Sequence, residues 1–308
     1  MYLHIGKYLP DVKIIAKNSK TRKYFDNKGI DFLRMPSFPK LVIMGRQTPY
    51  KFPVEEIIKI GFDHGLYQFK RWTSPKNYNG FDIYFVSSNN QVETAKSMGI
   101  NSTYAVGYPK LDNAFNGFYD EKFLNNIKDK KNLDSNKKTI IFTATWDVAG
   151  LSAIDKWIDR IEELNNKYNI LVTVHTWTKE VHKEKLRSSN KIVFIEEFDP
   201  TPYLMLADVF VGDYSSIIGD FCSLNKPIIT FRVPKSDRTI NEIDELIKSI
   251  SVQVDNFDEL KNAIDISLEN PGNKSEERKK ANRILFYKLD GKAGERAAEQ
   301  IKKYFNKS

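Results

Sequence analysis

Two adjacent serines stand between two carboxylates in the stretch GDYSSIIGDF, residues 212–221. They follow the apolar run DVFV, and a Gly-Asp pair after such a run indicates the end of a strand and a turn. A helix that begins near Ser215 would present free backbone N–H groups and its positive dipole end beside the hydroxyls of Ser215 and Ser216. This arrangement favours binding of an anion such as phosphate. An ordinary helix cap, in which Asp213 or Ser215 satisfies the first turn, is the alternative.

Two of the four histidines have a sequence context that suits chemistry. His175 ends the apolar run ILVTVH, so it is expected at the carboxyl end of a strand, where an imidazole can donate to phosphate oxygens. His64 lies between Asp63, which can raise its basicity, and Gly65, which lets a ligand approach the backbone. His64 is therefore a candidate general base. A histidine held by a hydrogen bond at a strand end is the alternative for His175, and adjacent side chains often point apart, which leaves the Asp63–His64 pairing open.

Three further stretches place polar groups after predicted strands or at a predicted helix start. TATWD (143–147) ends a strand with hydroxyls and a carboxylate, which makes Thr145 and Asp147 candidates for substrate binding. GYPKLDN (107–113) follows the run TYAVG, and DGKAGER (290–296) places glycines around Lys292, with Arg296 at the start of a helix. The last stretch is either a second anion-binding helix start or a turn with a cap.

Several kinds of site are excluded by the sequence. Four scattered histidines and one cysteine offer no metal-ligand spacing, so we expect no metal and no cofactor. The phosphate-binding pattern G-x-x-x-x-G-K-[ST], the dinucleotide pattern G-x-G-x-x-G and the hydrolase pattern G-x-S-x-G do not occur. The lone Cys222 has apolar neighbours, which indicates a buried, inert thiol and a reducing compartment.

Charge and hydropathy narrow the possible partners. The chain has 308 residues and a net charge of +8, and residues 273–308 hold eleven Lys or Arg against five Asp or Glu. This sign suits nucleic acid, an anionic membrane face or a phosphate-rich substrate, and a solvated lysine-rich surface is the alternative. RNA-binding aromatic motifs and zinc knuckles do not accompany the charge, so nucleic acid is disfavoured. Without a secretory signal or an apolar run of about 20 residues, we expect a cytoplasmic protein.

The elements that must position these residues follow a regular rhythm. Short runs rich in β-formers alternate with helical patterns, which is typical of βαβ units and parallel sheets. A Lys- and Asn-rich segment, residues 120–138, indicates a linker, and we place a domain boundary there: residues 1–135 and 136–308. Two such arrays predict an α/β fold of two facing Rossmann-like domains with a cleft between them, and ligands in such sheets bind beyond the carboxyl ends of strands.

Taken in chain order, these stretches resemble the CDP-glycerol glycerophosphotransferase family, which contains the polymerases and primases of teichoic acid synthesis. The resemblance covers roughly residues 55–305, and its sharpest part, DYSSIIGDFCSLNKPIITF (213–231), is similar to the family's D-Y-S-S, D-F and K/R-P signature. GYPKLDN is similar to the family's G-Y-P-R-x-D, TATWD to P-T-W-R-D, and LDGKAGER to D-G-K/R-A-S-x-R.

The resemblance implies a GT-B fold and transfer of glycerol phosphate from CDP-glycerol to a hydroxyl of a lipid-linked chain, with release of CMP. It implies that His64 is the general base and that His175 stabilises the donor phosphates together with Ser215 and Ser216. Substrate contacts are implied for the other residues at the matching positions, namely Gly65, Thr145, Asp147, Asp213, Tyr214, Lys292 and Arg296. It also implies that the basic C-terminal helices hold the enzyme at the anionic inner membrane face.

Three departures from the family pattern leave the polyol and the acceptor open. The family's Trp-His-Gly-Thr-Pro is Asp-His-Gly-Leu-Tyr here, residues 63–67, and Thr176 replaces the proline that usually follows the second histidine. TATWD lacks the arginine of P-T-W-R-D. A GT-B glycosyltransferase that uses a nucleotide sugar is the alternative, because the same phosphate-binding groups would serve it. The sequence leaves the oligomeric state unknown.

Overall fold

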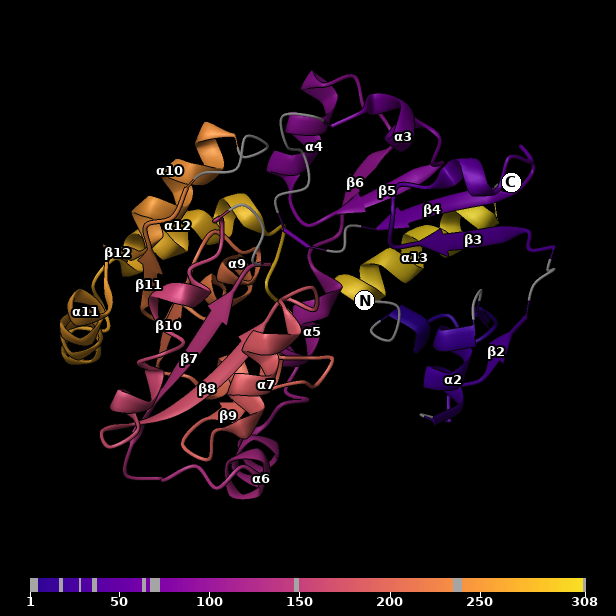
Figure 1. The fold of residues 1–308 in the computed structure, drawn as a ribbon. Helices are drawn as coiled ribbons and strands as arrows, with labels where there is room; N and C mark the ends of the chain where they lie inside the picture. The colour runs from indigo at the N-terminus through magenta and orange to yellow at the C-terminus, as the bar shows by residue number, and fades with distance from the viewer. Residues whose placement is uncertain are drawn as a thin grey trace. The chain divides into compact units, whose positions relative to one another are not determined.

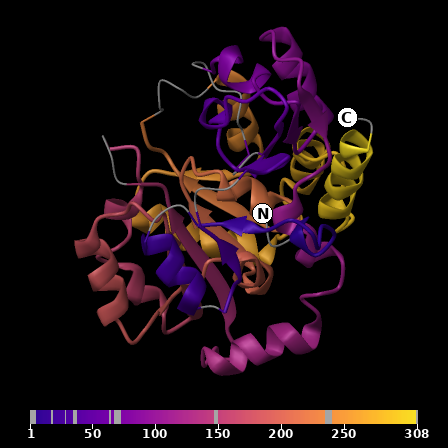
Figure 2. The same cartoon turned by 90° about the vertical axis from the view of Figure 1, so that its right-hand side faces the viewer.

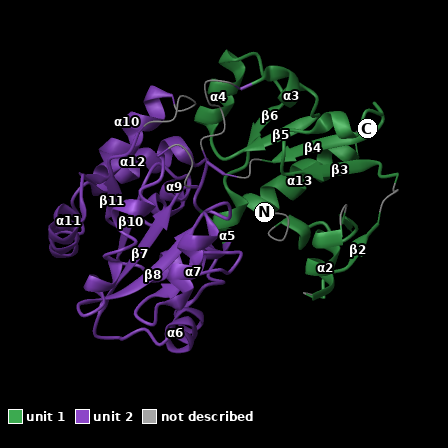
Figure 3. Cartoon of the chain, viewed as in Figure 1, with its two compact units in different colours: residues 1–64, 74–112, 290–308 green, residues 65–73, 113–289 purple. Residues whose placement is uncertain are grey.

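The chain divides into two compact units, which are described one at a time (Figures 1 and 3). The computed structural model describes residues 5–16, 19–27, 29–34, 38–62, 65–66, 73–146, 150–234 and 240–306. Unit 1 contains residues 1–64, 74–112 and 290–308, and unit 2 contains residues 65–73 and 113–289. Among the described residues, no helix is long and apolar enough to span a bilayer.

Unit 2 is built on a six-stranded sheet in which every neighbouring pair is parallel. The strands lie in the order β12-β11-β10-β7-β8-β9, so the direction in which successive strands are added reverses between β7 and β10. In sheets of this doubly wound kind, ligands bind outside the carboxyl ends of the strands at that reversal. The strands are β7 (Lys138–Ala144), β8 (Tyr168–Val174), β9 (Val193–Phe194), β10 (Val209–Gly212), β11 (Ile228–Phe231) and β12 (Val252–Val254).

Helices cover this sheet, and its central strands are buried along almost their whole length. Only the first residue of β7 is exposed, and β10 is buried throughout, which explains why these strands are nearly continuous apolar runs in the sequence. The connecting helices are α6 (Glu121–Lys130), α7 (Glu180–Ser188), α8 (Thr201–Leu206), α9 (Ile217–Cys222), α10 (Asn241–Ile250), α11 (Phe257–Glu269) and α12 (Ser275–Leu285), with 3-10 turns at η3 (Ile154–Lys156) and η4 (Ile161–Leu164).

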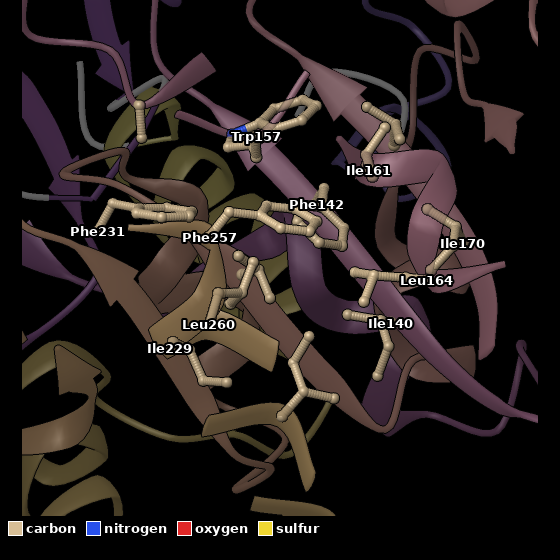
Figure 4. Close-up of a cluster of buried hydrophobic side chains, with 14 of the residues drawn as sticks. Ile140, Phe142, Trp157, Ile161, Leu164, Ile170, Ile229, Phe231, Phe257 and Leu260 are labelled. Atoms are coloured by element: carbon tan, nitrogen blue, oxygen red, sulfur yellow. The ribbon is translucent and has the colours of Figure 1, made fainter. Parts of the chain in front are cut away.

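A large apolar cluster on one side of the sheet holds unit 2 together (Figure 4). Trp157, which is fully buried, packs on Phe142 of β7 with ring centroids 5.4 Å apart. Phe257 and Leu260 of α11, the helix that follows the edge strand β12, belong to the same cluster. Full burial of a large apolar side chain stabilises the folded state by about 1.5 to 3 kcal/mol. This cluster therefore holds the carboxyl ends of β7 and β10 firmly in place.

Unit 1 contains a smaller parallel sheet in the order β3-β4-β5-β6 and a separate parallel pair of strands, β1 and β2. Its strands are β1 (Ile14–Ile15), β2 (Phe32–Leu33), β3 (Leu41–Met44), β4 (Ile58–Phe62), β5 (Ile83–Val86) and β6 (Thr103–Ala105). Its helices are α2 (Ser19–Asn27), α3 (Pro75–Asn79), α4 (Asn89–Ser97) and α13 (Ala293–Phe305), with 3-10 turns at η1 (Pro49–Lys51) and η2 (Pro109–Leu111); α5 (Asp112–Phe115) begins at the last residue of unit 1 before the chain enters unit 2.

The C-terminal helix α13 belongs to unit 1, although it comes last in the sequence (yellow in Figures 1 and 2). Its apolar stripe of Ala297, Ala298 and Ile301 is buried in one cluster with Ile60 of β4 and Phe85 of β5. The unit boundaries at residues 112–113 and 289–290 therefore differ from the predicted single boundary near residue 135, which assigned the C-terminal helices to the second domain. The predicted α/β class with parallel sheets is confirmed.

Candidate functional site

Three stretches with candidate residues lie at the carboxyl ends of three neighbouring strands of unit 2. Thr145 follows β7, His175 follows β8, and the stretch 213–216 follows β10, which lies beside β7. This edge is the place where the strand order reverses, and it is the expected ligand-binding edge of such a sheet. The structure thus gathers most of the predicted unit 2 residues at one place.

The strands β7 and β10 approach each other closely just before the site. A Cβ atom on Gly212 would lie 2.6 Å from the Thr143 hydroxyl oxygen and 2.7 Å from the Phe210 ring. Both neighbours are buried, so only glycine fits without moving the strands apart. Gly212 therefore sets the spacing from which the chain turns into Asp213.

The Asp213 side chain is fully buried and holds the loop after β7 in place. Its carboxylate accepts the backbone N–H of Thr145 at 3.0 and 3.1 Å and the backbone N–H of Ala153 at 2.9 Å. Burial raises the pKa of Asp213 to about 7, while these hydrogen bonds lower it. In this structure Asp213 holds Thr145 and Ala153 against β10, and its predicted contact with substrate stays a prediction.

The two serine hydroxyls are free to meet a ligand. Ser216 is the N-cap residue of α9, yet its side chain makes no capping hydrogen bond, and the Ser215 backbone N–H donates to the Asp213 carbonyl at 2.8 Å. Within the described part of the chain, no hydrogen bond is formed by either hydroxyl; Ser216 is exposed and Ser215 is half-buried. The helix-cap alternative for Ser215 is therefore not what the structure adopts, and the Asp213 carboxylate accepts the N–H groups of Thr145 and Ala153 instead.

Tyr214 ties the same loop to a neighbouring helix. Its hydroxyl donates to the Asp244 carboxylate of α10 at 2.5 Å, and Lys248 pairs with the other oxygen of Asp244 at 2.9 Å. Burial, followed by the Asp244 contact, raises the pKa of Tyr214 to about 12. Tyr214 remains an uncharged hydrogen-bond donor in this position, and it holds the serine loop against α10.

His175 is oriented as a neutral hydrogen-bond donor. Its backbone N–H donates to the Ala144 carbonyl at 3.1 Å, and its Nδ1 accepts the Trp177 backbone N–H at 3.1 Å. Because Nδ1 is an acceptor here, the ring proton resides on Nε2. Partial burial, together with the positive charge of Lys183, lowers the pKa of His175. The imidazole can thus offer Nε2–H to a phosphate oxygen without itself carrying charge.

Two tryptophans that the sequence analysis passed over stand beside His175. Trp146 lies 5.1 Å from Trp177 between ring centroids, and the His175 ring lies 6.2 Å from Trp146 and 5.4 Å from Trp177. Trp146 is 36% exposed and Trp177 is 60% exposed, which is unusual for so large an apolar side chain. The signal in the sequence is a tryptophan shortly after each of two successive strands, two residues after β7 in TATW and three residues after β8 in VHTW.

In unit 1, the predicted anion site at the start of α13 is already filled by a carboxylate of the same chain. The buried Asp112 of GYPKLDN accepts the backbone N–H of Ala293 at 3.0 Å and that of Gly294 at 2.7 Å. Two of the stretches singled out in the sequence, 107–113 and 290–296, therefore interlock. The second alternative for 290–296, a turn with a cap, is the correct one.

Arg296 is also engaged within unit 1. Its Nε donates to the Val106 carbonyl at 2.9 Å, and its Nη1 donates to both carboxylate oxygens of Asp290 at 2.8 and 2.9 Å. Lys292 is exposed, and its backbone N–H donates to Asp290. The predicted substrate contacts of Lys292 and Arg296 stay predictions, and in the structure Arg296 stabilises the entry to α13.

The remaining predicted site residues are only partly described. His64 and Asp147 lie outside the described residues, and Gly65 is half-buried beside that stretch. Among the residues that the structure describes, no group of His, Cys, Asp and Glu could hold a metal ion. Cys222 is buried as predicted, and burial raises the pKa of its thiol to about 12, which makes it inert.

Comparisons with known proteins agree with the resemblance seen in the sequence. A family model described as CDP-Glycerol:Poly(glycerophosphate) glycerophosphotransferase matches residues 55–303. The teichoic acid poly(ribitol-phosphate) polymerase of Bacillus spizizenii is 26% identical over 250 residues, which are 73% of this chain and 38% of that protein. The teichoic acid poly(glycerol phosphate) polymerase of Staphylococcus epidermidis is 25% identical over 134 residues, 41% of this chain and 19% of that protein. The chain thus matches well under half the length of these two relatives.

Solved structures share the fold. A variant of the wall teichoic acid polymerase TagF superposes with a TM-score of 0.72 at 19% identity, over 99% of this chain and 85% of that chain. The complex of MnaA from S. aureus with UDP superposes with a TM-score of 0.63 at 16% identity, over 99% of this chain and 93% of that chain. These likenesses confirm the predicted GT-B-like fold class; the cleft between the domains stays a prediction.

Proposed function

The chain belongs to the CDP-glycerol:poly(glycerophosphate) glycerophosphotransferase family, and on that premise we propose that it transfers a polyol phosphate, glycerol phosphate in the first instance, from a CDP-activated donor to a hydroxyl of a lipid-linked surface polymer. The observation that carries the proposal is the set of uncharged donors at the strand-order reversal of unit 2. Ser215, Ser216 and His175 offer two hydroxyls and one Nε2–H at that edge.

These groups suit the demands of the reaction. The acceptor oxygen forms a bond to the phosphorus that carries the polyol, the bond from that phosphorus to the bridging oxygen breaks, and CMP leaves with the bridging oxygen. Charge develops on phosphate oxygens during this exchange, and hydrogen-bond donors fixed in advance stabilise it. The exposed rings of Trp146 and Trp177 add apolar faces on which a nucleobase can stack. The proposed reaction uses no metal and no cofactor.

The acceptor hydroxyl must lose its proton, and the proposal assigns this step to His64. A general base of this kind contributes about 10² to 10⁴ in rate. The relatives include both ribitol-phosphate and glycerol-phosphate polymerases, so the polyol of the donor is part of what the test must decide.

The test is CMP release from CDP-glycerol, with CDP-ribitol and UDP-sugars as parallel donors. We expect turnover with a CDP-alcohol and at least a roughly 100-fold lower rate for His64→Ala, because the acceptor hydroxyl then lacks its base. His182→Ala is the matched control, since His182 lies on α7 and pairs with Asp155 at 3.4 Å; it should keep the wild-type rate.

Each other result changes a specific part of the proposal. Turnover that survives in His64→Ala would keep the reaction class and discard His64 as the base. Thermal stabilisation by UDP-sugars and none by CDP-alcohols would replace the proposal with a glycosyltransferase.

Peripheral binding to the inner membrane face, through the basic C-terminal helices, is part of the proposal. Lys279, Lys280 and Arg283 on α12, and Lys302 and Lys303 on α13, are exposed cations. Because the apolar stripe of α13 is buried in unit 1, the attraction should be electrostatic, without insertion of that helix. We therefore expect binding to vesicles that contain anionic lipids, and release as salt screens the charges. Equal binding to neutral vesicles would contradict this part of the proposal.

A further inference from the structure

Unit 1 contains a cavity of about 1000 Å³ that has no part in the site described above. Its walls come from β1 and the residues before it, Leu33 of β2, the edge strand β3 and the residues before it, Lys51 and Phe52 at η1, and the last turn of α13. A volume of this size lies at the upper end of the range for pockets that bind small molecules, about 300 to 1000 Å³. The cavity can therefore take a long ligand.

The walls of the cavity are mainly aliphatic and aromatic. Ile14 and Ile15 of β1, all four residues of β3 and Ile301 of α13 contribute to them. Leu33, Phe38 and Phe305, which also line the cavity, are 46%, 95% and 44% exposed. Large apolar side chains gathered in one exposed hollow indicate a binding site for an apolar group.

Lysines accompany this apolar surface. Lys13, Lys40, Lys51 and Lys302 line the cavity, and among the lining residues that the structure describes Asp11 is the single carboxylate. In the part of the chain that the structure describes, none of these four lysines forms an ion pair. Some lysines on the surface of unit 2 are paired with carboxylates: Lys131 pairs with Glu197 at 2.6 Å, and Lys167 pairs with Asp265 at 2.6 Å. The cavity thus combines an apolar interior with unpaired positive charge.

We propose that this cavity binds the aliphatic chain of a phosphate-bearing lipid, and that this lipid is the anchor of the acceptor. The apolar walls fit hydrocarbon, and the lysines fit the phosphate that joins it to the rest of the acceptor. The identification of the lipid as the acceptor's anchor rests on the proposed function. A peptide strand added to the edge of β3 would also use the groove, but it would leave the four lysines without counter-charge.

Dodecyl phosphate, used below its micelle-forming concentration, tests the proposal by isothermal titration calorimetry on the full chain. Dodecyl maltoside has the same chain with an uncharged head, and inorganic phosphate has the charge without the chain. We expect dodecyl phosphate to bind at least about tenfold more tightly than either. Equal affinity for the two dodecyl compounds, or no binding of dodecyl phosphate, would overturn the proposal.

Variants locate the binding. Leu33→Glu, and separately Phe38→Glu, should weaken dodecyl phosphate binding about tenfold or more, because each places a carboxylate against the chain. Both side chains are exposed, so the fold should tolerate the changes. Val181→Glu on α7, where Val181 is 63% exposed, is the matched control and should bind as the wild type does. Unchanged binding in both cavity variants would place the ligand elsewhere.

The charge is tested in the same way. Lys13→Glu combined with Lys302→Glu should reduce the affinity for dodecyl phosphate to that for dodecyl maltoside, and Lys96→Glu on α4, outside the cavity, should have no effect.

CMP release, measured on the same proteins, separates the two proposals. If the wild-type protein releases CMP but does not bind dodecyl phosphate, the lipid site alone is overturned. Without CMP release from any CDP-alcohol the proposed function falls, and the titration still decides whether the cavity binds lipid.

Discussion

Asp213→Ala should destabilise unit 2 by about 2 to 6 kcal/mol, because two backbone N–H groups, one at a half-buried and one at a buried residue, are left without an acceptor at about 1 to 3 kcal/mol each. The groups are the backbone amides of Thr145 and Ala153. Urea unfolding followed by tryptophan fluorescence measures this, since Trp146, Trp157 and Trp177 all belong to unit 2. CMP release should fall with it, because the loop after β7 loses its attachment to β10.

Asp208→Ala is the matched control for this change. Asp208 also accepts a backbone N–H, that of Thr139 at 2.8 Å, but its side chain is 36% exposed, so water can replace it. We expect a loss of about 1 kcal/mol or less there. An equal loss of unfolding free energy in the two variants would mean that the burial of Asp213 adds nothing to stability.

The contribution of Asp213 should also depend on pH. Its pKa of about 7 in the folded protein lies above the ordinary value near 4, so the folded state binds the proton more tightly than the unfolded state does. The stabilisation is then complete below about pH 4 and declines as the pH rises toward 7, by at most about 1.4 kcal/mol per pH unit. The free energy of unfolding of the wild type, relative to Asp213→Asn, should fall across this window. A constant difference would show that the pKa is not raised.

Asp112→Ala should have an effect of similar size on unit 1. The carboxylate is buried and accepts the backbone N–H groups of Ala293 and Gly294 in the first turn of α13. Its removal leaves two buried donors unsatisfied, about 2 to 6 kcal/mol together, and removes a negative charge from the positive end of the helix dipole. Hydrogen exchange of peptides that cover α13 measures the loss, and we expect much faster exchange over the helix.

Asp120→Ala provides the comparison for a surface cap. Asp120 caps α6 by accepting the Phe123 N–H at 2.7 Å, and it is exposed, so its loss should cost about 1 kcal/mol. If exchange in α13 stays slow in Asp112→Ala, the helix is held by its apolar stripe alone and Asp112 contributes little.

Much of the fold and the place of the site could be predicted from the sequence, because the patterns that indicate them involve neighbouring residues. The continuous apolar runs of β7, β8 and β10 predict buried parallel strands, and polar residues directly after them predict a site at the carboxyl edge. The family membership was visible because short stretches occur in a fixed order, from His64-Gly65 to LDGKAGER, and the family model matches the same part of the chain.

The roles of individual carboxylates could not be predicted in this way. For Asp213 the sequence predicts a contact with substrate, and for Asp112 it gives only a place in the family-like stretch GYPKLDN. Whether a carboxylate faces a ligand or a backbone N–H depends on contacts over long sequence separations: 68 residues from Asp213 to Thr145, and 181 residues from Asp112 to Ala293. In the folded chain both carboxylates accept backbone N–H groups, and these contacts are not visible in the sequence.

What the sequence determined by itself is the class of fold, the family and the stretches that contain the chemistry, because periodicity and motif order are properties of neighbouring residues. The tertiary structure decided which of those residues remain available to a ligand. Among the described residues, it left the hydroxyls of Ser215 and Ser216 without a hydrogen-bond partner, made Nε2 of His175 the donor nitrogen, and placed Trp146 beside Trp177. It also moved α13 into unit 1, because an apolar stripe packs against whichever core receives it, and the order of the chain does not say which core that is.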